Sequence, residues 1–145
     1  MPSALYNRDI LRLAASIPHL GRLAAPQASV EKSSPVCGSR VVVEVVMDAR
    51  GRVVQLGQEV RACALGQASA ALMGAEAIGR SAAELTDARD ALAGFLAGRR
   101  DDPGDWAGLD VLAAARDFPA RHPSILLAFE AAAEAAARAM RADAA

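Results

Sequence analysis

The stretch RVVVEVVM at residues 40–47, continued by DARG and then by RVVQLGQEV at residues 52–60, decides the fold of this chain. The first segment is rich in β-branched residues and is bounded by turn residues, which predicts a strand. Asp48 at the start and Gly51 at the end of the next four residues favour a tight turn. The second segment predicts the return strand of an antiparallel hairpin, with a bulge at Gly57.

The segment before the hairpin predicts one helix and one connection. Asn7 suits the N-cap of a helix. Apolar residues follow it at helical spacing, namely Ile10, Leu13, Ala14 and Ile17. Pro18 and Gly21 end this helix. Residues 22–35 contain two prolines and several small polar residues, so they predict an extended connection.

The segment after the hairpin predicts only helices. Their expected ranges are 64–78, 81–98, 106–115 and 119–140. Ser81 and Glu84 form a capping box, and Gly79 suits the end of the preceding helix. From Ala131 onward the last helix is nearly all Ala, Glu and Arg, which predicts a solvated end. This order indicates an α+β fold with helices packed on one face of a small antiparallel sheet, with a third strand as an open alternative.

The composition favours one domain over residues 1–145. Hydrophobic residues make up 53% of the chain and aromatic residues 3%, so Leu, Val, Ile and Ala must build the core, with Trp106 as an anchor. The formal net charge is −1 and the basic residues are scattered, which argues against a nucleic-acid-binding protein. We find no secretory signal and no stretch that could span a bilayer, so we expect a cytoplasmic protein with reduced thiols.

Two cysteines and a histidine are the candidates for chemistry. Cys37 precedes the first strand and is followed by Gly38. Cys63 lies where the return strand ends and a helix starts, a position that favours the thiolate. His122 precedes Pro123 at the start of the last helix, where the neutral, metal-binding imidazole is favoured. The spacing matches neither C-x-x-C nor a zinc finger, so a buried apolar cysteine and an exposed histidine remain open alternatives.

Three motifs occur along the chain in a recognisable order. They are PVCG at residues 35–38, CALGQASA at residues 63–70 and PARHPSILLA at residues 119–128, with the hairpin between the first two. In this order and spacing, the chain resembles the N-terminal scaffold domain of the NifU/IscU/SufU family of iron–sulfur cluster assembly proteins. The resemblance implies an IscU/SufE-like α+β fold and a scaffold without substrate turnover, which is not an enzyme.

The resemblance also implies a site at one end of the hairpin. Cys37, Cys63 and His122 would converge there to bind an iron–sulfur cluster or zinc, and Cys63 would accept sulfur from a cysteine desulfurase. Apo iron–sulfur proteins would be further partners, with no nucleic acid and no membrane involved. Two family residues differ, because the aspartate after Cys-Gly is Ser39 here and the cysteine after the histidine is Pro123. The site would then have three strong ligands and an open fourth position.

Two alternative functions stay open. The chain could be a zinc-bound partner in sulfur transfer, or a degenerate family member that keeps the fold as a protein-interaction module. The metal content of anaerobically purified protein separates these hypotheses, because the scaffold would carry iron and sulfide, the sulfur-transfer partner zinc alone, and the interaction module neither.

Overall fold

The predicted hairpin forms the centre of the sheet. The computed structural model describes residues 4–35 and 38–144, and in it β2 (Ser39–Met47) pairs antiparallel with β3 (Val53–Arg61). Asp48 closes the turn, because its carbonyl oxygen accepts a hydrogen bond from the Gly51 N–H at 3.0 Å. The hairpin and its turn are therefore confirmed.

The bulge lies closer to the turn than predicted. The register of the two strands shifts next to Met47, which leaves Val54 as the bulged residue. Gly57 pairs regularly with Glu44, so the bulge prediction at Gly57 is wrong. A Cβ atom at Gly57 would lie 2.6 Å from the carbonyl oxygen of Gly21, so this glycine instead lets the N-terminal segment cross β3 closely.

A third strand, β1 (Ala28–Ser34), pairs antiparallel with β2 and gives the sheet the order β1-β2-β3. The segment predicted as an extended connection therefore ends in a strand. Its sequence ASVEKSS lacks a strong alternation of apolar and polar residues. Only Val30 and Ser34 are buried in this strand, and the other side chains are exposed or half-buried. This strand brings Ser34 opposite Ser39, at the end of the sheet where the candidate site lies.

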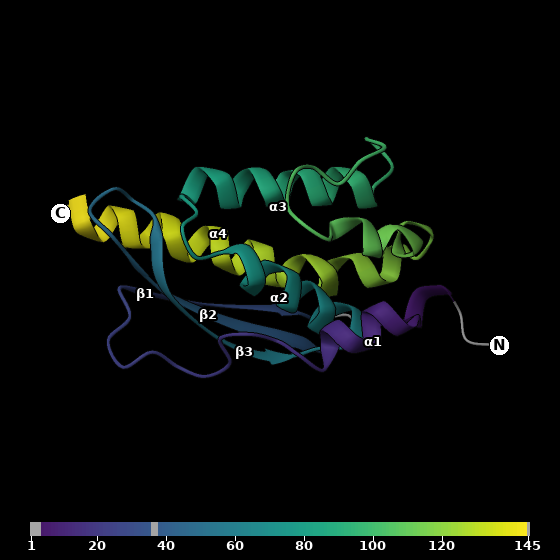
Figure 1. The fold of residues 1–145 in the computed structure, drawn as a ribbon, viewed down its shortest axis with the longest axis horizontal. Helices are drawn as coiled ribbons and strands as arrows, with labels where there is room; N and C mark the ends of the chain where they lie inside the picture. Colours follow the sequence, from purple (N-terminus) through teal and green to yellow (C-terminus); the bar gives the residue numbers. More distant parts are fainter. Residues whose placement is uncertain (1–3, 36–37, 145) are drawn as a thin grey trace.

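Helices cover one face of the sheet (Figure 1). In the described part of the chain, the α-helices are α1 (Arg8–Ala14), α2 (Ala64–Glu76), α3 (Ala82–Leu96) and α4 (His122–Ala144). The short 3₁₀ helices η1 to η3 span Ala4–Tyr6, Leu109–Asp117 and Pro119–Arg121. α4 lies on β1 and β2 with α2 beside it, and α3 covers α4 from the opposite side. This arrangement confirms the predicted α+β fold. Within the described residues, none of these helices combines the length and apolar composition of a membrane span.

The alanine-rich part of α4 is the centre of the core, so the prediction of a solvated helix end is wrong. Six alanines between residues 131 and 139 are at most 2% exposed. The more exposed side is a narrow stripe that carries Glu130, Glu134, Arg138 and Arg141. Alanine methyl groups let β1, β2, α2 and α3 approach the helix closely on its remaining sides.

Several local predictions are confirmed. The Asn7 Oδ1 accepts a hydrogen bond from the Ile10 N–H at 3.0 Å and caps α1. Ser81 caps α3 as part of a complete capping box. Trp106 is buried, donates its indole N–H to the Leu72 carbonyl at 2.8 Å, and meets the Phe129 ring edge-on. The short helix expected there is a 3₁₀ helix that starts later, as η2.

A buried carboxylate ties the N-terminal segment to the sheet. Glu44 is only 2% exposed, and it accepts hydrogen bonds from the Leu23 N–H at 2.8 Å and from the Arg22 Nε at 2.9 Å. Burial alone would raise the pKa of Glu44. The hydrogen bonds from Arg22 and Leu23 outweigh burial and hold this pKa below its ordinary value of 4.5.

We expect Glu44→Gln to lower the free energy of unfolding by about 2 kcal/mol at neutral pH, because a buried, charge-assisted acceptor is lost. The folded-state pKa of Glu44 lies below the unfolded value, so its contribution is complete above about pH 4.5 and is lost as the pH falls through the folded pKa. Denaturation of both proteins at neutral and acidic pH measures this difference in stability. A difference that does not narrow in acid would contradict the assignment.

Candidate functional site

Cys63 lies at the junction of β3 and α2. β3 ends at Arg61, and Cys63 is the N-cap of α2, with an extended backbone at φ −64° and ψ 170°. Its thiol is half-buried, and its Sγ lies 3.5 Å from the Ser124 Oγ. The predicted position of this cysteine at the start of a helix is confirmed.

Two buried serines connect this thiol to the other elements of the site. The Ser39 Oγ, at the start of β2, lies 2.9 Å from the Ser124 Oγ, in the first turn of α4. Both residues are at most 3% exposed. The starts of β2, α2 and α4 therefore meet at one end of the sheet, around a chain of contacts from Ser39 through Ser124 to Cys63.

The close approach of α2 and α4 depends on small residues. A Cβ atom at Gly66 would lie 2.6 Å from the Ser124 Oγ. One turn further along α2, the Ser69 Oγ donates a hydrogen bond to the Ile125 carbonyl at 2.6 Å. The sequence of α2 thereby holds the first turn of α4 against the Cys63 thiol.

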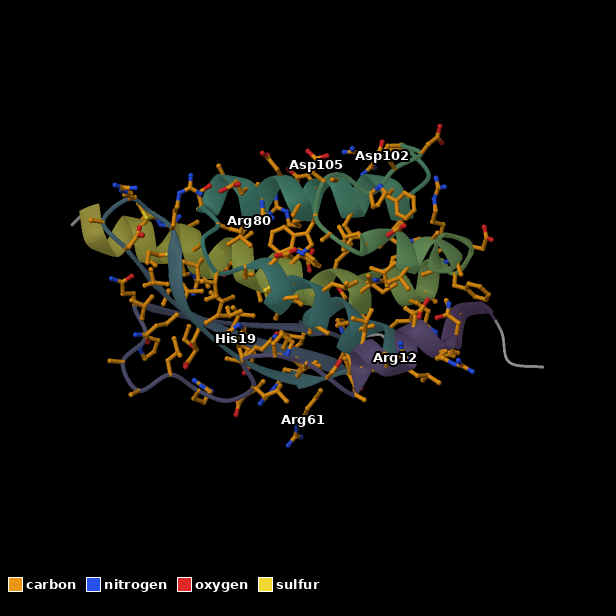
Figure 2. All side chains as sticks on the ribbon, viewed as in Figure 1. Arg12, His19, Arg61, Arg80, Asp102 and Asp105 are labelled. Atoms are coloured by element: carbon orange, nitrogen blue, oxygen red, sulfur yellow. The ribbon has the colours of Figure 1, made fainter. Side chains whose placement is uncertain are left out.

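The thiol lines a shallow, open pocket of about 380 Å³ together with Gly38, Ser39 and Gln67. Gly38 adjoins Cys37, which lies outside the described residues. Arg61 lines the same pocket, but its side chain extends away from the sheet into solvent (Figure 2). A small reactant or a partner side chain can therefore reach the Cys63 sulfur.

His122 is the first residue of α4, and its ring is held in one orientation. The His122 Nε2 lies 2.7 Å from the Ala115 carbonyl oxygen. A carbonyl oxygen can only accept a hydrogen bond, so Nε2 carries the hydrogen and the neutral ring presents the lone pair of Nδ1. Proteins commonly orient metal-binding histidines by such a bond. His122 lines a second pocket, together with Ser34 and Pro35.

Comparison with solved structures gives the family. The N-terminal domain of the nitrogen-fixing NifU-like protein from Brucella abortus is 38% identical to this chain, with a TM-score of 0.90 over 95% of this chain and 96% of the other. This chain belongs to the NifU-like family. No family model and no curated protein matches the sequence.

Two more distant solved structures share the NifU-like fold. A putative iron–sulfur cluster assembly scaffold protein for the SUF system, from Fervidobacterium islandicum, is 19% identical, with a TM-score of 0.85 over 94% of this chain and 99% of the other. A hypothetical protein is 23% identical, with a TM-score of 0.80 over 89% of this chain and 94% of the other.

Two of the three predicted site residues of this NifU-like chain, Cys63 and His122, are described by the structure, and they line different pockets. Cys63 contacts Ser124, which follows His122 by two residues on α4. Cys37 lies outside the described residues, so the convergence of all three predicted ligands stays a prediction. Among the residues that the structure describes, no group of three His, Cys, Asp or Glu side chains could hold a metal ion.

The two positions that depart from the family pattern differ in their surroundings. Ser39 is buried and in contact with Ser124, whereas Pro123 is exposed on the first turn of α4. Sequence reasoning missed Ser124, which connects Ser39 to Cys63. Its only signal was its position inside the last motif, directly after His122 and Pro123.

Proposed function

We propose that this NifU-like chain is a scaffold-like protein of iron–sulfur cluster assembly, which accepts sulfur on Cys63 from a cysteine desulfurase. The observation that carries this proposal is the accessible Cys63 thiol at the start of α2, which contacts the Ser124 hydroxyl and shares a pocket with Gly38. The protein carries out no reaction cycle of its own, and apo iron–sulfur proteins receive what it holds.

Sulfur transfer to Cys63 needs no additional redox reagent. The Cys63 thiolate attacks the terminal sulfur of a persulfide on the desulfurase, and a new S–S bond forms on Cys63. The S–S bond to the desulfurase cysteine breaks, that cysteine leaves as a thiolate, and the proton stays on the transferred sulfur. The Ser124 hydroxyl, at 3.5 Å, can donate a hydrogen bond to the sulfur of Cys63 before and after transfer.

Iron, zinc or a cluster would be cargo held by Cys37, Cys63 and His122. Thiolate and imidazole are the ligand types that these metals prefer. The orientation of His122, with its Nδ1 lone pair available, suits this role. Pro123 cannot donate a ligand, and a partner protein would complete the coordination.

A second candidate function is zinc-dependent sulfur transfer without cluster assembly. One observation favours it, since the hydroxyl that replaces the family aspartate, that of Ser39, is buried and in contact with Ser124. Three strong ligands suit zinc with one open position better than they suit a cluster. The third alternative is a protein-interaction module that binds no metal.

The test combines metal analysis with single-cysteine variants. Protein purified anaerobically is incubated with a cysteine desulfurase and cysteine, and the sulfur bound to each chain is measured by mass spectrometry. We expect one added sulfur atom on the wild type and on Cys37→Ser, and none on Cys63→Ser. Iron with sulfide in the purified wild type supports the scaffold, and zinc alone supports the second candidate. Sulfur retained by Cys63→Ser would contradict Cys63 as the acceptor.

A further inference from the structure

A second groove lies between the end of β1 and the first turns of α4. It has a volume of about 440 Å³, and its walls are apolar, formed by Leu126, Leu127 and three prolines. Polar groups come from Ser34, His122 and Glu130. An occupant of this groove therefore meets an apolar channel with a few hydrogen-bonding groups.

Ser34 is an unusual member of the groove. It is 3% exposed, and its Oγ has no hydrogen-bond partner among the residues that the structure describes. A buried hydroxyl without a partner costs free energy relative to its hydrated state. A ligand or side chain that donates a hydrogen bond to this hydroxyl would remove the cost.

Glu130 is the second group without a partner, because its carboxylate makes no ion pair with a described residue. One turn further along α4, Glu134 pairs with Lys32 of β1 at 2.8 Å. Two residues along a strand advance about 6.6 Å and four along a helix about 6 Å. Ser34 of β1 therefore lies at the same height along α4 as Glu130, just as Lys32 lies at the height of Glu134. Unlike Lys32, Ser34 carries no positive charge that could pair with the carboxylate opposite it.

We propose that this groove binds a lysine or arginine side chain of a partner protein. The alkyl stem would lie along Leu126 and Leu127, and the cationic head would pair with Glu130, as Lys32 pairs with Glu134 within the chain. The head would also donate to the Ser34 Oγ, which can accept. The Glu130 carboxylate selects a cation over an anion, and the Ser34 hydroxyl is compatible with that choice because it can accept a hydrogen bond from the cation. The proposal goes beyond the proposed function and does not depend on either cysteine.

Binding of the side chain is tested by NMR titration of the full chain with capped amino acids at constant ionic strength. The probes are the N-acetyl methylamides of lysine, arginine, norleucine and glutamate. We expect saturable shifts of the Ser34, Leu127 and Glu130 amides with the two cations, with dissociation constants on the order of millimolar. Norleucine, which has the stem without the charge, should bind about three- to tenfold more weakly.

Variants assign the binding to the groove. Glu130→Gln should weaken binding of the cationic probes about three- to tenfold. Glu76→Gln, which removes the same charge from α2 outside the groove, should leave binding unchanged. Ser34→Lys should fill the site from within and abolish binding. If that variant does not fold, Glu130→Gln still decides the question.

Several results would overturn the proposal. They are the absence of saturable shifts with lysine and arginine, equal binding of norleucine, preferred binding of glutamate, or equal effects of Glu130→Gln and Glu76→Gln. Tighter binding of free lysine or arginine than of the capped forms would also overturn it, because the groove would then be a site for a free amino acid and not for a protein side chain.

Discussion

Ala135→Leu is expected to destabilise the protein by about 3 kcal/mol and to lower its melting temperature by about 10 °C. Ala135 is fully buried in the middle of α4, a helix that packs against β1, β2, α2 and α3. A leucine there would insert three extra carbon atoms into a closely packed contact between helices or between helix and sheet. Chemical and thermal denaturation measure the effect.

Ala137→Leu is the matched control in the same helix. Ala137 is half-buried and adjoins the charged stripe, so an added side chain can turn toward solvent. The control should change the free energy of unfolding by less than about 0.5 kcal/mol. Equal destabilisation by both substitutions would show that the cost comes from helix propensity and not from packing.

Restoring the two family ligands is expected to raise the affinity of the chain for metal by a large factor. The double variant Ser39→Asp, Pro123→Cys should raise zinc affinity by roughly a hundredfold, because it adds a thiolate and a carboxylate to the three proposed ligands. Competition with a chromophoric zinc chelator measures this affinity. Cluster absorbance after anaerobic reconstitution, compared with the parent, measures cluster retention. This prediction depends on the proposed function.

The two substitutions carry different costs. Ser39 is buried and in contact with Ser124, so an aspartate there would be a desolvated charge and should destabilise the metal-free protein. Pro123 is exposed, so its loss should cost little. Ser16→Asp with Pro26→Cys is the matched control, since both residues are exposed and neither lines the pocket of Cys63 or the groove of His122. Two results would contradict the hypothesis that the fourth coordination position is open. They are a parent protein that already retains a full cluster, and a double variant whose zinc affinity and cluster retention equal those of this control.

The sequence predicted the elements that have strong local signals. Valine-rich runs on either side of a turn specified the hairpin, and side-chain caps specified the starts of α1 and α3. A third strand was an open alternative and is present, but its position was not predicted, because an edge strand with one exposed face keeps polar residues such as Glu31 and Lys32. The core position of α4 was missed because alanine gives little hydrophobic contrast, so the narrow charged stripe was the only signal of which side faces solvent.

The position of Cys63 in the candidate site could be predicted from the sequence, but the contacts of Ser124 could not. The junction of β3 and α2 placed Cys63 correctly, because a strand end and a helix start can be recognised from local sequence. The contacts of Ser124 with Ser39 and Cys63 join residues that lie far apart in the sequence. Such contacts depend on how closely α2 and α4 approach, which no local pattern encodes.

The alanine packing of α4 has a mechanical consequence for the site at its first turn. Long, flexible side chains can change rotamer and let a helix slide or rotate, but methyl groups in close contact have no rotamers to exchange. Gly66 and Ser69 hold the same end of α4 with similarly short contacts. His122 and Ser124 are therefore fixed in register with Cys63, and a docking partner must adapt its own surface to a preset spacing.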